Sequence, residues 1–166
     1  MSIERFFLLD PYNDNHLNML SSFEKNNNLK GIVDSIKNIR SIPKEKYLDK
    51  RKTEIIKEDI IFTEKEGKIT DCCFVQIEED RGWCNIFPYD ITNKSKKRKL
   101  PLLASEYAFS NSKVEEVNIT VLPEDINMQN NLIEKGFICL GDNNGRIMYL
   151  KDREEKENSQ RMISWI

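Results

Sequence analysis

The chemistry that this sequence most plainly offers is phosphate binding, because cations are crowded into one short segment. The segment reads TNKSKKRK and is called the basic loop below (residues 92–99); its cations are Lys94, Lys96, Lys97, Arg98 and Lys99. Clustered cations bind phosphate groups through charge-assisted hydrogen bonds, or they remain solvated on a surface loop. By composition, a run such as KKRK also matches nuclear import signals and nucleic-acid-binding patches. All four interpretations are open until the flanking sequence is considered.

The charge balance of the whole chain argues against nucleic acid as the partner. The 166-residue chain has a formal net charge of −2, whereas domains that bind polyanions usually carry a net basic surface. The basic loop also lacks interleaved aromatic residues on which bases could stack. Nucleic-acid binding through Lys96, Lys97, Arg98 and Lys99 therefore stays only an alternative.

The cysteines predict neither a metal site nor a disulfide framework. Cys72 and Cys73 are adjacent, Cys84 and Cys139 stand alone, and the chain has a single histidine. This spacing does not fit a zinc site, and no metal is expected. All four cysteines lie in apolar, strand-like runs, so we expect buried, reduced thiols in a cytoplasmic protein. No apolar run approaches the ~20 residues of a membrane span, and no membrane partner is expected.

The pattern of apolar residues predicts a single mixed α/β domain over residues 1–151. Apolar residues recur at helical spacing over residues 29–39 and alternate with polar ones over residues 117–121. Turn residues at 64–68, 79–82 and 141–145 separate short strands. The expected order is β-α-α-β-β-β-α-β-α-β-β, with a mostly antiparallel sheet flanked by helices. Residues 44–57 are interpreted as a linker or a poorly packed helix.

The last residues form a separate feature in this interpretation. Residues 152–166 are charged up to the ending MISWI, which is apolar. An apolar end of this kind is expected to dock on the body of the protein or on a partner. If the partner is a second copy of the chain, we expect a homodimer through the apolar C-terminus.

Two overlapping segments resemble the GNAT superfamily of N-acetyltransferases. The first is EYAFSNSKVEEVNITVLPED (residues 106–125), which is similar to the family's helix, strand and Pro-Glu-Asn ending. The second is LPEDINMQNNLIEKGF (residues 122–137), which resembles the following helix and its Lys-x-Gly-Phe-like turn. The order of strands and helices extends this resemblance, more loosely, over nearly the whole chain.

The resemblance implies an acetyl-CoA-dependent N-acetyltransferase. In that family, a deprotonated primary amine attacks the thioester directly, and a strand amide, here near Phe87, stabilises the oxyanion. The strand at Ile86 and Phe87 would accept the pantetheine arm through its backbone. The basic loop would occupy the place of the pyrophosphate loop, which precedes a helix. The implied coenzyme-binding residues are Ile86, Phe87, Thr92, Lys94, Ser95, Lys96, Lys97, Arg98, Lys99 and Asp125.

The basic loop departs from the family's pattern at its most informative positions. Thr92 stands where Arg or Gln is usual, and Ser95 and Lys97 stand where two glycines are usual. Pro101 falls in the expected first turns of the helix, so this helix should begin late, near Leu100. The lysines would then replace lost backbone contacts with charge.

Two further departures concern the next helix and the chemistry. Asp125, a plausible N-cap, stands where the family has Asn, and Leu132 stands where a tyrosine often protonates the leaving thiolate. Carboxylates at Glu78, Glu79 and Asp80, or at Asp90, could relay a proton from the amine or remain solvated in turns. The sequence therefore assigns no catalytic residue. A catalytically inactive GNAT-like binding or regulatory module is the alternative function.

Overall fold

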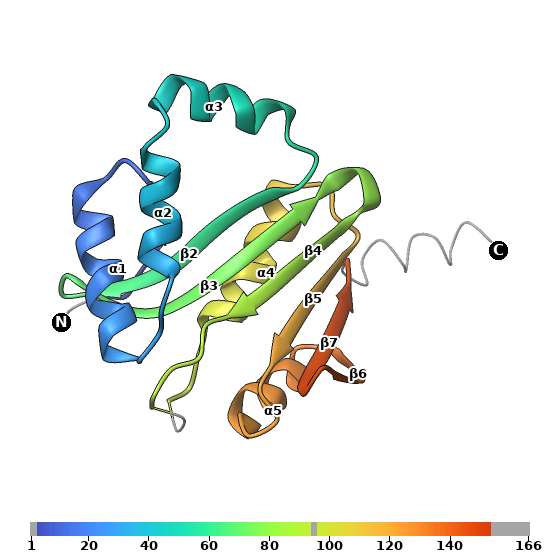
Figure 1. Cartoon of the computed structure of the whole chain (residues 1–166). Helices are drawn as coiled ribbons and strands as arrows, with labels where there is room; N and C mark the ends of the chain where they lie inside the picture. Colours follow the sequence, from blue (N-terminus) through green and yellow to red (C-terminus); the bar gives the residue numbers. More distant parts are fainter. Residues whose placement is uncertain (1–2, 94–95, 154–166) are drawn as a thin grey trace.

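The computed structural model describes residues 3–93 and 96–153 of the chain (Figure 1). Lys94, Ser95 and residues 154–166 lie outside this part. The predicted apolar C-terminal tail, its boundary at residue 152 and the homodimer therefore stay predictions. Among the described residues, each helix is too short or too polar to cross a membrane.

The described residues form one seven-stranded sheet with the strand order β1-β2-β3-β4-β5-β7-β6. All neighbouring strands are antiparallel except β4 and β5, which are parallel. The predicted mixed, mostly antiparallel sheet is thus confirmed. The strands are β1 (Arg5–Leu8), β2 (Lys57–Lys65), β3 (Lys68–Glu78), β4 (Trp83–Pro88), β5 (Glu116–Val121), β6 (Ile138–Asn143) and β7 (Arg146–Asp152).

Five α-helices and one short 3₁₀ helix connect these strands in the described part of the chain. They are α1 (Asp14–Asn26), α2 (Ile32–Arg40), α3 (Lys44–Thr53), η1 (Glu79–Arg81), α4 (Leu100–Asn111) and α5 (Ile126–Glu134). The predicted order is confirmed, and α3 and the short η1 are present in addition to it. None of the residues of α3 is buried, which matches the poorly packed helix rather than the linker.

The sheet separates two hydrophobic cores. On one face, α1 and α2 cover β1, β2 and β3 around a core that includes Leu20, Phe62 and Cys72. On the other face, α4 packs behind the sheet against residues such as Ile86 and Ile119 (Figure 1). Alternate residues of β2 and β3 enter opposite cores: Ile61 and Cys73 enter one, and Phe62 and Cys72 enter the other.

Helix α4 crosses from the end of β4 to the start of β5, which makes these two strands parallel. The helix begins at Leu100, as predicted, because Pro101 fits only the first turn. One cysteine prediction is wrong: Cys139 is exposed, since β6 is the outermost strand. Cys72, Cys73 and Cys84 are buried free thiols, as expected.

Candidate functional site

The parallel strands β4 and β5 diverge at their ends, and this divergence forms the candidate site. Their pairing runs from Trp83 and Glu116 to Ile86 and Ile119 and ends there. β4 nevertheless continues to Pro88 and stays paired with β3. β5 continues to Val121 and stays paired with β7. The two strand ends are therefore held apart by their outer neighbours, and a small cavity is lined by residues at both ends, Pro88 and Val121. The space between the two strand ends is called the β4–β5 cleft below.

Pro88 limits the number of N–H donors that the backbone of β4 can present to the β4–β5 cleft. The N–H of Tyr89 donates to the carbonyl of Cys72 on β3, 3.0 Å away. The register between β3 and β4 is unbroken, so the N–H of Phe87, two residues earlier, also faces β3. Pro88 faces the cleft and has no N–H. The N–H of Phe87 itself therefore points away from the cleft, and the expectation of a strand amide near Phe87 stays a prediction.

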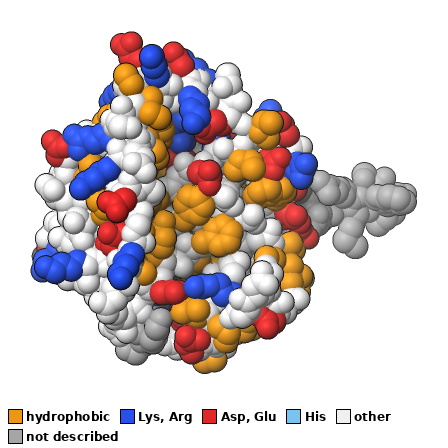
Figure 2. Space-filling model, viewed as in Figure 1, with side chains coloured by type: hydrophobic (Ala, Val, Ile, Leu, Met, Phe, Trp, Pro, Cys, Tyr) orange, Lys and Arg blue, Asp and Glu red, His pale blue; other side chains and the backbone are white. Residues whose placement is uncertain are grey.

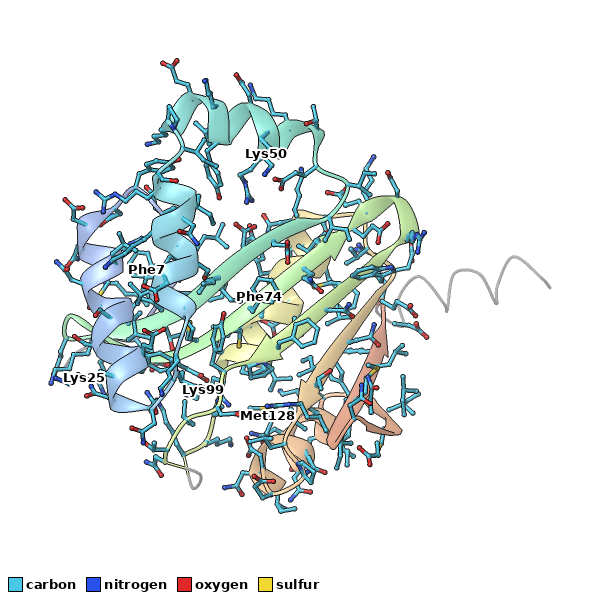
Figure 3. The ribbon with its side chains drawn as sticks, viewed as in Figure 1. Phe7, Lys25, Lys50, Phe74, Lys99 and Met128 are labelled. Carbon is cyan, nitrogen blue, oxygen red and sulfur yellow. The ribbon has the colours of Figure 1, made fainter. Side chains whose placement is uncertain are left out.

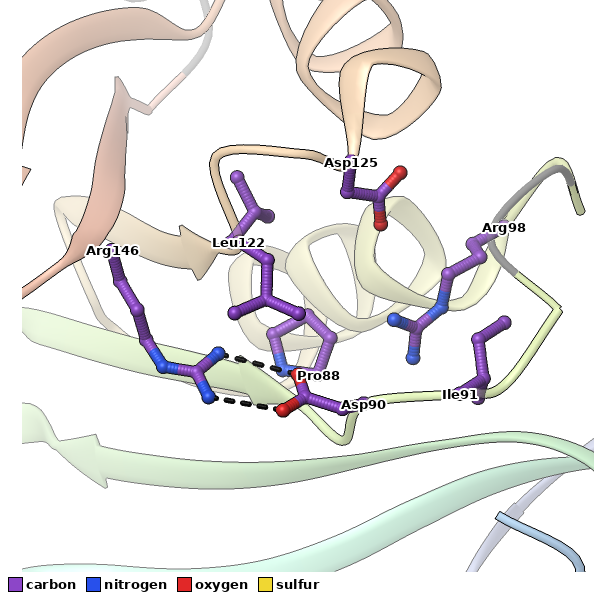
Figure 4. A pocket seen from close by; sticks show the side chains of 8 residues that line it. Pro88, Asp90, Ile91, Arg98, Leu122, Asp125 and Arg146 are labelled. Atoms are coloured by element: carbon purple, nitrogen blue, oxygen red, sulfur yellow. Dashed lines mark hydrogen bonds and ion pairs between the residues drawn. The ribbon is translucent and has the colours of Figure 1, made fainter.

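A small cavity lies where the β4–β5 cleft meets the basic loop and the start of α5 (Figure 4). Its volume is about 10 Å³, which is roughly enough for one water molecule. Its lining combines apolar side chains of β4, β5 and their connections with two arginines and two aspartates. The lining residues are Pro88, Asp90, Ile91, Arg98, Val121, Leu122, Asp125 and Arg146.

Arg98, predicted to bind the coenzyme, is instead held inside the protein by Asp71. Its Nε donates to both carboxylate oxygens of Asp71 at 3.1 and 3.0 Å, and its Nη2 donates to the carbonyl of Tyr89 at 2.8 Å. Both side chains of the ion pair are about 5% exposed or less. Burial disfavours the charged guanidinium, but the hydrogen bonds and charge of Asp71 outweigh it and raise the pKa of Arg98. Arg98 therefore anchors the basic loop to β3 and to the end of β4.

Two other residues of the basic loop are also bound to the protein. The Lys96 ammonium donates to the carbonyl of Thr70, next to Asp71. The N–H of Thr92 donates to the side-chain oxygen of Asn27, at the end of α1, over 3.0 Å. By contrast, Lys97 and Lys99 are exposed. These two lysines are the described cations of the loop that face solvent.

Asp90 and Arg146 form a second ion pair, which spans the β4–β5 cleft. The Arg146 nitrogens lie 3.3 and 3.1 Å from the two carboxylate oxygens of Asp90. Asp90 follows β4 and Arg146 begins β7, so the pair joins the two sides of the cleft (Figure 4). Both side chains are about 40% exposed. The sequence prediction of Asp90 as a proton relay overlooked this arginine.

Asp125 lies at the start of α5, on the β5 side of the cavity. As predicted, it is the N-cap: its carboxylate accepts a hydrogen bond from the N–H of Met128 over 3.2 Å. The same carboxylate adds negative charge beside Arg98. With each arginine paired to an aspartate, the cavity itself carries no excess positive charge. Among the described cations of the basic loop, Lys97 and Lys99 are exposed and could supply that charge to an anion.

The structure is similar to those of several N-acetyltransferases. The ribosomal-protein-S5-alanine acetyltransferase from Vibrio fischeri aligns with a TM-score of 0.67 at 10% identity, over 93% of this chain and 98% of that chain. The spermidine/spermine N-acetyltransferase SpeG from Vibrio cholerae aligns at 0.60 and 14%, over 95% and 98%. PseH from Campylobacter jejuni, in complex with acetyl coenzyme A, aligns at 0.57 and 12%, over 92% and 100%.

The chain has the GNAT fold. This rests on the structural similarities, since no protein-family model and no curated protein matches the sequence. In this fold the basic loop follows β4 and leads into α4, which is the order that the sequence resemblance predicted. Ile86 is the last residue of β4 that pairs with β5, and Phe87 follows it.

Three other side chains are buried or already paired with a neighbouring side chain. Leu132, in the place of the tyrosine, is fully buried. The Tyr149 hydroxyl donates to the side-chain oxygen of Gln129 over 2.9 Å. Glu78 is buried and lies 3.3 Å from the Arg81 guanidinium at the far end of β4. The structure brings none of these three to the cleft as a catalytic group.

The sheet face beside α2 is the second surface that borders the cleft. Figure 2 shows hydrophobic side chains gathered on this face, where α1 and α2 leave the sheet uncovered. Phe74 lies near its centre (Figure 3). Phe87, which is 37% exposed, lies beside Phe74, with ring centroids 6.1 Å apart. An acceptor that reaches the cleft from this face would cross these two rings.

Proposed function

We propose that this chain is an acetyl-CoA-dependent N-acetyltransferase that acts on a primary amine. The observation that supports it is the β4–β5 cleft, which opens directly beside a loop rich in cations and the start of α4. Helix N-termini and clustered lysines favour phosphate groups. The structural neighbours include an acetyltransferase bound to acetyl coenzyme A, and the fold is shared with it.

The predicted coenzyme residues would have different roles in binding. Lys97 and Lys99 would contact the phosphates, while Arg98, Lys96 and Thr92 hold the loop in place. Lys94 and Ser95 are proposed for the same phosphate site. Asp125 would act by fixing the start of α5. The backbone of Ile86 and Phe87 would border the pantetheine arm.

The reaction would be a direct transfer of the acetyl group. The nitrogen lone pair of the neutral amine forms a bond to the thioester carbonyl carbon, and the carbon–sulfur bond breaks. The nitrogen loses one proton, and the leaving thiolate takes up one proton, so the products are the amide and the free thiol of coenzyme A. The cleft would contribute chiefly by holding the two reactants together. Because Pro88 supplies no N–H, β4 adds little to oxyanion stabilisation, and we expect slow turnover. The buried, reduced thiols agree with a cytoplasmic location, which belongs to this proposal.

Calorimetric titration with acetyl-CoA tests the coenzyme site. We expect the double variant K97Q/K99Q to bind at least about tenfold more weakly than the wild type, because two charge-assisted contacts are lost. The matched control K44Q/K46Q removes the same charge from exposed lysines of α3 and should keep the wild-type affinity. Absence of wild-type binding at millimolar acetyl-CoA would refute the proposal.

Pro88 specifically favours a second candidate function, a non-catalytic module that binds the coenzyme without transferring the acetyl group. Release of free coenzyme A thiol across a panel of primary amines separates the two functions. Binding without release would support the module. In that case the variant P88A, which restores an N–H facing the cleft, should bring turnover above background. Thiol release in the wild type would support the enzyme instead.

A further inference from the structure

A cavity of about 180 Å³ lies between α2, α3 and the strands β2 and β3. Aliphatic side chains of the β1–α1 connection, α2 and β2 line part of it, with Ser35, Glu58 and Asp59 beside them. Three aromatic rings complete the wall: Tyr47 of α3, Phe74 of β3 and Tyr89, which follows β4. A dry apolar cavity of about 150 Å³ can hold one benzene molecule. The volume and lining therefore fit a single group of the size of an aromatic ring.

One of the two carboxylates that line this cavity is already paired. Asp59 accepts a hydrogen bond from the Arg51 guanidinium over 2.9 Å, and Lys57 adds another positive charge near it. Glu58, which is exposed, accepts a hydrogen bond from the Gln76 amide over 3.0 Å, and Glu54 adds negative charge near Tyr47. An apolar group is favoured by the aromatic and aliphatic side chains that line the cavity.

Two neighbouring phenylalanines lie between the cavity and the end of β4: Phe74 lines the cavity, and Phe87 precedes Pro88 at the β4–β5 cleft. Phe74 and Phe87 are cross-strand partners on β3 and β4, and their ring centroids are 6.1 Å apart. Neighbouring strands are about 5 Å apart. A molecule seated against Phe74 therefore needs a linker of only about two or three carbon atoms to reach the edge of the cleft beside Phe87.

We propose that this cavity, the ring pocket, binds the aromatic group of the acceptor. The acceptor is then an arylalkylamine, a primary amine joined to an aromatic ring by a short aliphatic linker. This inference rests on the proposed acetyltransferase function and names its substrate class. The ring packs among Tyr47, Phe74 and Tyr89, and the amine lies at the cleft.

Filling the ring pocket tests the inference. Ser35 lines the pocket from α2 and is exposed, so the variant S35F should add a ring to the pocket without entering the core. For the wild type we expect kcat/KM for 2-phenylethylamine to exceed that for butylamine by about tenfold or more, since the ring buries more apolar surface. S35F should bring this ratio near one. The control N38F adds the same ring to an exposed position of α2 outside the pocket and should keep the wild-type ratio.

The outcomes separate this inference from the coenzyme proposal. An unchanged ratio in S35F, or a preference for putrescine over 2-phenylethylamine, would overturn the ring pocket while acetyl-CoA binding still stands. Saturation-transfer NMR of 2-phenylethylamine with the wild type and S35F needs no coenzyme. A signal in the wild type that S35F abolishes supports the ring pocket even if acetyl-CoA fails to bind, and no signal contradicts it.

Discussion

Two arginine–aspartate pairs border the same small cavity, and they differ in burial. Arg98 and Asp71 are each at most about 5% exposed, and Arg98 also binds the carbonyl of Tyr89. Arg146 and Asp90 are about 40% exposed and meet across the β4–β5 cleft. A buried pair that loses one partner leaves an uncompensated charge, whereas an exposed pair separates at little cost. The first pair therefore fixes the basic loop, and the second can separate when a ligand enters.

This difference also explains how the described part of a loop without glycine is held against the sheet. The family pattern uses backbone N–H groups that glycine brings close to phosphate. Here the loop is tied to the sheet through Arg98 and Lys96, and its shape depends on side chains. Lys97 and Lys99 are then left facing solvent, where they can supply charge.

Breaking the buried pair should have the largest effect on stability. The variant D71N leaves the Arg98 guanidinium buried without its counter-charge, and we expect a loss of about 3–5 kcal/mol in the free energy of unfolding. Urea denaturation followed by circular dichroism measures it. In the double variant D71L/R98L both charges are absent, so its loss should be smaller than that of D71N. A loss below about 1 kcal/mol in D71N would contradict the role assigned to this pair.

The burial of the Cys84 thiol in β4 should also make the free energy of unfolding depend on pH. Burial raises the pKa of the Cys84 thiol from an ordinary value of 9.0 to about 12. Between these two values the unfolded chain loses the thiol proton while the folded chain keeps it, so stability falls as pH rises. The expected slope is about 1.4 kcal/mol per pH unit for this thiol.

Urea denaturation of the wild type and of C84A between pH 9 and 10 measures that slope. The fall in stability should be shallower in C84A by about the contribution of one thiol. An equal slope in the wild type and C84A would show that Cys84 is not in a dry environment.

Breaking the exposed pair of Arg146 and Asp90 should have the smallest effect on stability. The variant D90N removes a negative charge from the cleft and frees Arg146. Stability should change by less than about 1 kcal/mol, and acetyl-CoA should bind about two- to fivefold more tightly. Calorimetry measures the affinity, with E79Q as a control that removes an exposed carboxylate at the other end of β4. Weaker binding by D90N would mean that the intact pair helps to hold the coenzyme.

The strand and helix order was predictable because its signals are local. The alternation of Val117, Ile119 and Val121 produces a buried strand face, and Pro101 sets the start of α4. The capping role of Asp125 follows from its place before a helix. Each of these signals lies within one or two turns of the chain.

The pairing of charges was not predictable from local signals. Asp71 and Arg98 are 27 residues apart, and Asp90 and Arg146 are 56 apart. One signal could have found the first pair: Asp71 lies in the otherwise apolar run TDCCFV, and a carboxylate there requires a buried partner. The direction of the Phe87 N–H depends on the register between β3 and β4, which the sequence does not show.

Hydrogen–deuterium exchange with and without acetyl-CoA tests the central claim, that the β4–β5 cleft is the coenzyme site, most directly. We predict slower exchange on both edges of the cleft, in peptides covering residues 86–91 and 119–122, and in the basic loop. Peptides of α3 should be unaffected. Slower exchange confined to other parts of the chain, or no change at millimolar acetyl-CoA, would contradict the assignment.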